Sequence, residues 1–298
     1  MTPEGLWIPL ITPFRDGELD EASLQRMVTH YAALPVDGLI LAATTGEGLS
    51  LDNEEIDRLV LATKAALATA KRQMPLYLGL SGGATVKVVK ALHRTQMLPV
   101  DGYLIACPYY TRPSQAGLFQ HFSTLAENTA RPILIYNIPY RTGVNLGNET
   151  MLRLAEIENI VGVKDCSADA AQSFDLLRDR PEGFSVLTGE DALFYTALTQ
   201  GANGGITASA HVETLAFANI RNSLNHGDQL GALAAWRALA DVPRLLFQEP
   251  NPAPIKHWLW RTGLIDSPEL RLPMVPVTEG LAARIDQQIE RVKLRAAA

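Results

Sequence analysis

Residues 159–167 read NIVGVKDCS, and the segment begins as a short, uncharged run rich in β-branched residues. Such a run is typical of a strand that is buried on both faces. Lys164 stands at its C-terminal end, whereas the other lysines of the chain lie in or beside segments with helical patterns. Apolar surroundings lower the pKa of a lysine, and this is how lysines that form Schiff bases become nucleophilic. The alternative is a strand-end lysine whose amine simply reaches water.

Similar strand-like runs alternate with amphipathic, helix-length segments on both sides of this one. The predicted strands are 6–12, 38–43, 76–79, 102–106, 132–136, 160–164, 184–188 and 204–206. The clearest predicted helices between them are 20–34, 53–69, 84–97, 114–129 and 148–157. This alternation indicates parallel strands joined by crossover helices, and eight such units predict a (β/α)₈ TIM barrel. An open doubly wound sheet is the alternative, but the chain lacks the Gly-rich nucleotide loop that such a sheet carries after an early strand.

Strand signals stop at His211, while helical signals continue to the end of the chain. The predicted helices there are 228–247, 254–260 and 277–292. Since 298 residues fit either two domains or one large barrel, length does not decide the organisation. We predict a catalytic barrel over residues 1–225 and a helical region over residues 226–298.

The composition excludes several classes of protein. A net charge of −6 without a local basic stripe argues against a nucleic-acid partner. No apolar run approaches the roughly 20 residues that span a bilayer, and the first residues show no signal-peptide pattern. Cys107 and Cys166 are too few for a disulfide framework. We therefore expect a cytoplasmic protein with neither a membrane nor a nucleic-acid partner.

Polar side chains follow the predicted strands, at the end of the barrel where active sites are built. Thr44 and Thr45 come after the second strand, and a loop with Tyr110 comes after the fourth. Tyr136 ends the fifth strand, and Arg141 follows it. A lysine, hydroxyl groups and an arginine together suit a 2-oxo acid, because the amine forms an imine, the hydroxyls transfer protons and the guanidinium binds a carboxylate.

Each of these groups also has an ordinary structural explanation. The two threonines could only cap a turn, Tyr136 could be a core tyrosine, and Arg141 could be a surface arginine. Glu190 and Asp191 could cap the following helix. The six histidines show no HExxH spacing, and the chain has no GxSxG motif or P-loop, so we predict neither a metal site nor a cofactor site.

Five groups of residues, together with a closing LRLPM (270–274), carry a resemblance to a known family. They are TTGE (44–47), YY (109–110) before RPSQ (112–115), YNIP (136–139) with RTG (141–143), GVK (162–164), and NP (251–252) with PIK (254–256). In this order they resemble the dihydrodipicolinate synthase and N-acetylneuraminate lyase superfamily over essentially the whole chain. The synthase branch is the more similar.

The resemblance implies a class I aldolase-type reaction. Lys164 is expected to form a Schiff base with pyruvate, whose enamine attacks aspartate-4-semialdehyde before the product cyclises to 4-hydroxy-tetrahydrodipicolinate, a step of lysine and diaminopimelate biosynthesis. Thr44, Tyr136 and Tyr110 resemble the proton relay of the family, with Tyr110 supplied by a neighbouring subunit. The family is typically a homotetramer built from tight dimers, without a dissociable cofactor.

The same resemblance implies the substrate contacts. Thr45 corresponds to a contact with the pyruvate carboxylate, and Arg141 to the clamp for the distal carboxylate of the aldehyde. Gly189 and Ile206 correspond to backbone contacts near the lysine. Ala43 stands where the family usually has glycine, and Tyr140 is large where synthases mostly carry Ser, Gly or Ala.

The departure at Tyr140 leaves two alternatives. A related pyruvate-dependent aldolase or dehydratase would act on another aldehyde or a sugar acid, and a non-catalytic protein would only bind a 2-oxo acid. A second departure concerns inhibition by lysine, which many synthases bind at a subunit interface. The matching positions here are Gly48, Leu49, Asn53, Ile56, Gly83, Lys87 and Tyr109. Lys87 stands where lysine-sensitive members carry a glutamate, so we predict that lysine does not inhibit this protein.

Overall fold

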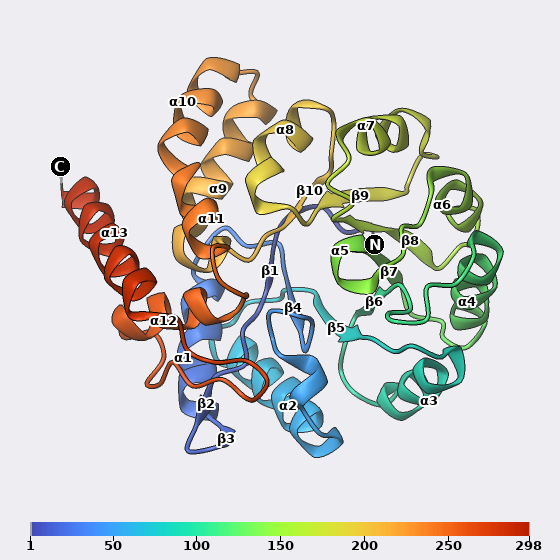
Figure 1. Ribbon diagram of the computed structural model, residues 1–298, viewed down its shortest axis with the longest axis horizontal. Coiled ribbons are helices and arrows are strands. Elements are labelled where there is room, and N and C mark those ends of the chain that lie inside the picture. Colours follow the sequence, from blue (N-terminus) through green and yellow to red (C-terminus); the bar gives the residue numbers. More distant parts are fainter. Residues whose placement is uncertain (1, 298) are drawn as a thin grey trace.

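The computed structural model describes residues 2–297, with side chains to residue 294, and its centre is a closed barrel of eight parallel strands (Figure 1). These strands are β1 (Gly5–Pro9), β4 (Gly38–Leu41), β5 (Leu76–Leu80), β6 (Gly102–Ala106), β7 (Ile133–Asn137), β8 (Ile160–Asp165), β9 (Ser185–Thr188) and β10 (Gly204–Ile206). Each coincides with or overlaps one predicted strand. The barrel closes between β1 and β10, which confirms the TIM-barrel prediction and excludes the open sheet.

Helices surround the barrel between consecutive strands (Figure 1). They are α1 (Glu21–Ala32), α2 (Asn53–Thr69), α3 (Thr85–Thr95), α4 (Gln115–Glu127), α5 (Pro139–Thr142), α6 (Asn148–Leu154), α7 (Ala170–Asp179) and α8 (Phe194–Thr199). Capping side chains set where several of them begin. Asp52 and Glu55 form a capping box at the start of α2, the helix whose predicted bounds match the observed ones.

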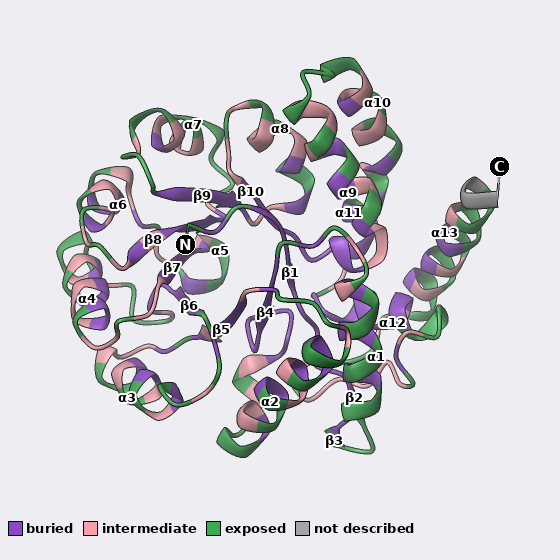
Figure 2. Ribbon diagram, turned by 180° about the vertical axis from the view of Figure 1, so that it is seen from behind, coloured by how far each residue is buried: buried purple, intermediate pink, exposed green. Residues whose placement is uncertain are grey.

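The barrel strands are buried along almost their whole length, as Figure 2 shows in purple. One apolar cluster fills the inside of the barrel and includes Ile40, Leu134 and Leu187. Trp7 and Tyr77 meet there edge to face, with ring centroids 5.0 Å apart. A larger cluster lies between the strands and the surrounding helices. Burial on both faces explains why the strands were recognisable as uncharged runs.

Five further helices lie together at one side of the barrel (Figure 1). They are α9 (Ala210–Asn225), α10 (Gln229–Leu239), α11 (Asp241–Leu246), α12 (Ala253–Arg261) and α13 (Glu279–Ala297). α10 packs on α9, and α9 in turn packs on β1 and α12. We retain the division at 225/226 as a proposal, since it falls in the turn between α9 and α10.

Two local predictions need correction. The single helix predicted over 228–247 is two helices, because Pro243 lacks the N–H that would continue the hydrogen bonding of α10 into α11. A small hairpin was also missed: β2 (Phe14–Arg15) pairs with β3 (Glu18–Leu19). Its turn residues Asp16 and Gly17 both have positive φ, 56° and 84°, as a two-residue hairpin turn requires.

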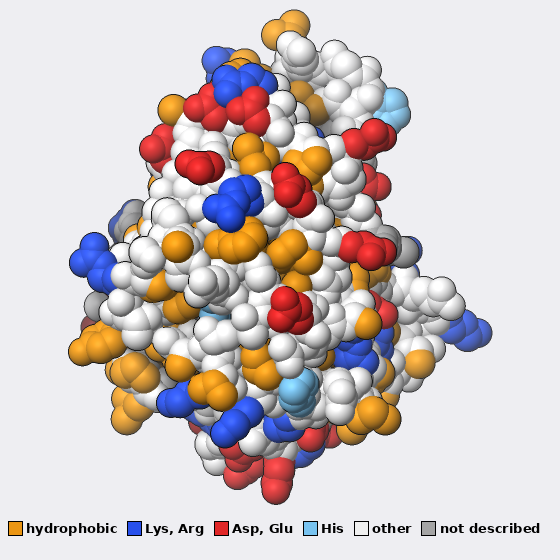
Figure 3. Space-filling model, turned by 90° about the vertical axis from the view of Figure 1, so that its right-hand side faces the viewer, with side chains coloured by type: hydrophobic (Ala, Val, Ile, Leu, Met, Phe, Trp, Pro, Cys, Tyr) orange, Lys and Arg blue, Asp and Glu red, His pale blue; other side chains and the backbone are white. Residues whose placement is uncertain are grey.

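The surface over α3, α4 and α6 carries charges of both signs (Figure 3). Acidic and basic side chains are interspersed there with small groups of hydrophobic ones. Among the described residues on this face, no continuous basic stripe is visible. None of the helices within residues 2–297 is long and apolar enough to cross a membrane.

Candidate active site

Seven of the eight predicted site residues line one narrow pocket, whose volume is about 20 Å³. They are Thr44, Thr45, Tyr136, Arg141, Lys164, Gly189 and Ile206. All lie at or just beyond the C-terminal ends of barrel strands, because parallel strands bring their carboxyl ends to the same edge. Tyr140, Asp191, Ala208, Phe247 and Asn251 complete the lining.

Lys164 is the central group of this pocket. It is only 5% exposed, and its Nζ lies 4.4 Å from the centroid of the Tyr136 ring. The two residues are neighbours because they are register partners of β8 and β7. Burial lowers the pKa of Lys164, although the negative charges of Cys166, Asp191 and Glu190 would oppose this shift. In the described part of the chain Lys164 forms no ion pair, so its amine is buried without a carboxylate partner.

Tyr136 and Thr44 form the hydroxyl side of the pocket. Burial raises the pKa of Tyr136 well above its usual value, so the phenol keeps its proton at neutral pH. The Thr44 side chain acts in the opposite direction on the pKa of Tyr136, but it offsets the effect of burial only in small part. The pocket therefore holds a protonated phenol and a second hydroxyl together with the lysine, groups of the kind that transfer protons.

Gly189 makes room for the lysine. A Cβ at this position would overlap Lys164 Cε and Cys166 Sγ. The backbone N–H of Gly189 donates to the carbonyl of Asp165 at 2.8 Å, which holds the end of β9 against β8. Any larger residue would displace the Lys164 side chain.

Arg141 lies on the short helix α5, at the boundary between the narrow pocket and a wider cavity of about 710 Å³. Its guanidinium carbon lies 5.4 Å from the Tyr140 ring centroid. The wide cavity is also lined by Glu190 and by residues of α11 and the segment that follows it. The structure therefore places the Arg141 guanidinium and the Tyr140 ring where the narrow pocket meets the wide cavity.

The acid pair after β9 has two different environments. Asp191 is buried and accepts hydrogen bonds from the backbone N–H groups of Ala208 and Ser209. Burial raises the pKa of both Asp191 and Glu190. Asp191 thus fixes the loop after β10, and both acids line the wide cavity. Neither contributes to a group of three or more potential metal ligands, and no such group exists among residues 2–294.

Tyr110 is the predicted site residue that does not line the pocket of its own chain. It is 91% exposed and has a φ of 71°, with its N–H donating to the Thr142 carbonyl at 3.2 Å. Its assignment to the pocket of a neighbouring subunit stays a prediction. The two cysteines, by contrast, are free and buried, as structural cysteines are, and burial raises the pKa of both.

Two lining residues from the segment between α11 and α12 were not predicted as site residues. Phe247 follows α11 and carried no signal. Asn251 was noticed only as part of the NP motif, yet its side-chain N–H donates to Thr45 Oγ1 at 2.9 Å. The motif was the signal that could have found it. Both come from the C-terminal helices, so the pocket is built by the barrel and this region together.

Comparison with known proteins identifies the family and agrees with the fold. A sequence model of the dihydrodipicolinate synthetase family matches residues 2–292. The chain is 44% identical over 287 residues to 4-hydroxy-tetrahydrodipicolinate synthase 2 of Clostridium acetobutylicum, an alignment that covers 96% of this chain and 99% of the relative.

Solved structures are similar over nearly the whole chain. The dihydrodipicolinate synthase of Thermotoga maritima superposes with a TM-score of 0.94 at 31% identity, covering 99% of this chain and 100% of the other. A structure described as the first monomeric dihydrodipicolinate synthase variant superposes with a TM-score of 0.93 at 31% identity, covering 98% and 97%. In sequence and in fold, the chain belongs to the dihydrodipicolinate synthetase family.

Proposed function

We propose that this protein condenses pyruvate with aspartate-4-semialdehyde to give 4-hydroxy-tetrahydrodipicolinate. The observation that carries the proposal is the Lys164 amine, which is buried without an ion pair beside a protonated tyrosine. The names of its relatives support the same reaction. A non-catalytic binding protein would have no use for an amine held in this state.

The chemistry follows from the groups in the pocket. The neutral amine of Lys164 attacks C2 of pyruvate, and loss of water leaves a protonated imine. This cation accepts the electrons of the C3–H bond when the proton leaves, which gives an enamine. C3 of the enamine then attacks the aldehyde carbon, and the aldehyde oxygen takes a proton. The amino group of the condensed product closes the ring at C2 and releases Lys164.

Proton transfer is assigned to hydroxyls around the lysine. The Tyr136 ring lies beside the Lys164 amine, and Thr44 lines the same pocket. Tyr110 of a neighbouring subunit completes this relay in our proposal. Thr45 would hold the pyruvate carboxylate, and the backbones of Gly189 and Ile206 would border the substrate near the imine.

The second substrate is selected at the mouth of the pocket. We assign the distal carboxylate of the aldehyde to Arg141, whose forked guanidinium suits that group. The contact between Arg141 and Tyr140 favours one competing proposal, in which Tyr140 redirects the pocket to a different aldehyde or to a sugar acid. A panel of aldehydes distinguishes the two.

The experiment is a coupled assay of purified protein with pyruvate and aldehydes that differ only in carrying a carboxylate. Our proposal expects aspartate-4-semialdehyde to give the highest kcat/KM. Arg141→Ala should lower kcat/KM for this aldehyde by roughly ten- to a hundredfold, while imine formation with pyruvate changes little. Preference of the native protein for uncharged aldehydes would support the Tyr140 alternative. Equal loss of both steps would make Arg141 a residue of the fold.

We further propose a homotetramer of tight dimers in the cytoplasm. The exposed Tyr110 supports an interface at that loop, because a large side chain that is 91% exposed gains most from a partner surface. Since one similar structure is described as monomeric, sedimentation analysis is needed to establish the assembly. The two free cysteines fit a reducing compartment.

A further inference from the structure

Asn251 occupies an unusual position for an uncharged amide. It is 7% exposed, lines both the narrow pocket and the wide cavity, and lies at the start of the segment that leads into α12. Its Nδ2 donates to Thr45 Oγ1 at 2.9 Å across 206 residues of sequence. Its Oδ1 is buried and has no hydrogen-bond partner among the described residues. A buried amide with one unmet acceptor calls for an explanation, since such groups are normally satisfied.

The contact fixes what Thr45 can do. A threonine hydroxyl has one proton to donate and two lone pairs that accept. Because Asn251 Nδ2 occupies one lone pair, the proton of Thr45 has to point elsewhere. Thr45 is itself only 4% exposed and lines the narrow pocket. Its O–H is therefore available to an acceptor on a ligand in that pocket.

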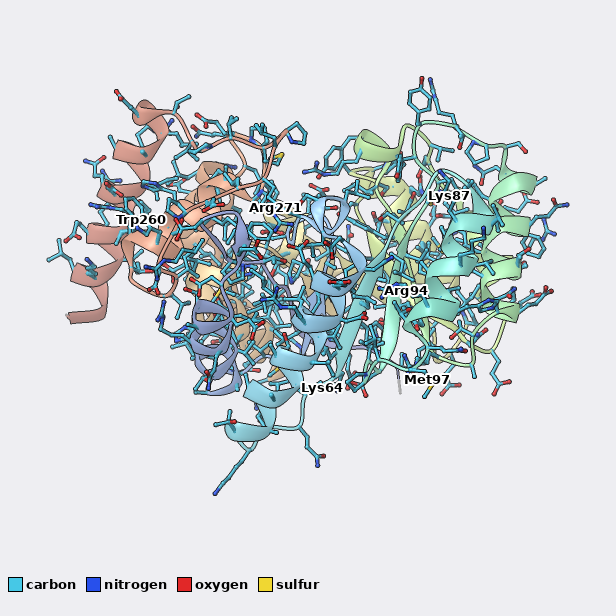
Figure 4. The ribbon with its side chains drawn as sticks, turned by 90° about the horizontal axis from the view of Figure 1, so that it is seen from below. Lys64, Lys87, Arg94, Met97, Trp260 and Arg271 are labelled. Carbon is cyan, nitrogen blue, oxygen red and sulfur yellow. The ribbon has the colours of Figure 1, made fainter. Side chains whose placement is uncertain are left out.

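The C-terminal region holds Asn251 against the Thr45 loop by a buried ion pair. Lys256 Nζ lies 2.5 Å from Glu47 Oε1, with 0% and 3% of the two side chains exposed. The Glu47 carboxylate also accepts the N–H of Arg271 at 3.0 Å. Figure 4 shows Arg271 where the C-terminal segment meets the barrel. Since Glu47 ends the same TTGE loop, the amide and the threonine cannot move apart independently.

Thr12 secures the loop from the opposite direction. Its hydroxyl donates to the carbonyl of Gly46 at 2.7 Å, from just beyond the end of β1. The N–H of Glu47 closes the turn on the carbonyl of Thr44 at 3.1 Å. These contacts fix the backbone of the loop on both sides. The orientation of the Thr45 hydroxyl then depends on the hydrogen bond that it accepts from Asn251.

We infer that Asn251 is a positioning residue for the 2-oxo acid, whose amide N–H aims the Thr45 hydroxyl proton at the substrate carboxylate. The inference rests on the proposed function, since it takes the pyruvate carboxylate as the acceptor. Asn251 acts through Thr45, and its role is to keep a donor facing the pocket. If the side chain at position 251 could only accept, the Thr45 hydroxyl would donate its proton to that side chain and not to the substrate.

The test compares two substitutions of nearly unchanged size. Asn251→Leu removes the amide donor. Asn251→Asp replaces it by a group that only accepts when ionised but donates when protonated. The readout is the pyruvate concentration that gives half-maximal trapping of the imine by borohydride, measured at about pH 8 and about pH 5. Asn159→Asp is the matched control, because its amide donates to the carbonyls of Ala126 and Thr129, away from the pocket.

At about pH 8 both Asn251 variants should need on the order of tenfold more pyruvate than the native protein, and the Asp variant more than the Leu variant. Burial raises the pKa of a carboxyl at this position, so the introduced Asp gains protons between about pH 8 and about pH 5. The ratio of the Asp variant to native protein should therefore fall as the pH is lowered, while the ratio of the Leu variant stays unchanged. Asn159→Asp should leave the pyruvate requirement unchanged at both pH values.

Two results would overturn the inference. If both Asn251 variants reach half-maximal trapping at the same pyruvate concentration as the native protein, the Thr45 hydroxyl does not need Asn251 to orient it. Loss of equal size in the two variants at both pH values would show that Asn251 only maintains the fold. Failure of the native protein to form any pyruvate adduct would instead refute the proposed function, so the two failures are distinguishable.

Discussion

Two buried lysines in this protein each lie beside an aromatic ring, but only one of them forms an ion pair with a carboxylate. Lys164 is 5% exposed and Lys256 is 0% exposed, and each amine faces an aromatic ring, at 4.4 Å for Tyr136 and 4.3 Å for Phe14. Lys256 also meets the Glu47 carboxylate and donates to the carbonyl of Glu269 at 2.7 Å. Lys164 has no such ion pair in the described part of the chain. The carboxylate partner, not burial, distinguishes a structural cation from a candidate nucleophile.

The pKa values express the same difference. Burial lowers the pKa of Lys256 to about 8, and the charge and hydrogen bond of Glu47 oppose a larger fall. Lys256 therefore stays protonated at neutral pH and bridges α12 to the loop after β4. For Lys164 the opposing carboxylates act only from a distance. An amine that is buried without compensation is the kind that loses its proton.

The first way to test the comparison is Lys164→Met, which keeps the length of the side chain and removes the amine. We expect a fall in kcat of at least about 10³-fold, because imine formation has no substitute. The melting temperature should stay the same or rise, since a buried polar amine without an ion-pair partner is replaced by an apolar side chain. Thermal unfolding followed by circular dichroism measures this. A clear loss of stability would mean that Lys164 serves the fold.

The same substitution at the second lysine should have the opposite outcome. Lys256→Met leaves the Glu47 carboxylate buried and unpaired, so the free energy of unfolding should fall by about 3–5 kcal/mol. Chemical denaturation measures the change. Adding Glu47→Gln to Lys256→Met should recover part of the stability, because the uncompensated charge is then gone. Loss below about 1 kcal/mol in the single variant would show that the ion pair contributes little.

The comparison extends to the tyrosines, since Tyr136 is buried beside Lys164 while Tyr110 is exposed. Tyr110→Phe should lower kcat on the order of 10²-fold without loss of stability. If Tyr110 acts in a neighbouring subunit, hybrids of Tyr110→Phe with Lys164→Met protein should regain partial activity, because one of the two sites then holds both native groups. Inactive hybrids of confirmed mixed composition would rule out the role across the interface.

The smallest expected effect concerns a third, exposed lysine. Lys87 lies on α3 and is labelled in Figure 4. A cation at this position repels the ammonium group of free lysine, so millimolar lysine should leave the initial rate unchanged. Lys87→Glu restores the acidic group and is the matched variant. Inhibition of the native protein, with Lys87→Glu no more sensitive, would contradict this interpretation of the pocket.

The barrel and most of the pocket could be predicted because their signals are local. Buried parallel strands leave uncharged runs in the sequence, and residues that follow such runs meet at one edge of the barrel. Lys164 and Tyr136 were found in this way, as partners at the ends of β8 and β7. The turn at Asp16–Gly17 and the break before Pro243 were also visible locally, and both were overlooked.

The remaining features depend on how distant segments meet. The burial of Lys256 follows from its contact with Glu47, and nothing in the residues around it distinguishes it from a surface lysine of a helix. The same holds for Asn251, whose partner Thr45 lies 206 residues earlier. The motifs indicated that these residues matter but not what they touch. Only the packing of the C-terminal helices against the barrel reveals those contacts.

Borohydride reduction in the presence of pyruvate, followed by peptide mass spectrometry, tests the difference between the two lysines most directly. We predict one covalent adduct, on the peptide that contains Lys164, and none on the peptide that contains Lys256. Because burial lowers the pKa of Lys164, trapping should persist to lower pH than for a solvent-exposed lysine and decline as pH falls through that pKa. An adduct on any other lysine, or no adduct with native protein, would contradict the account.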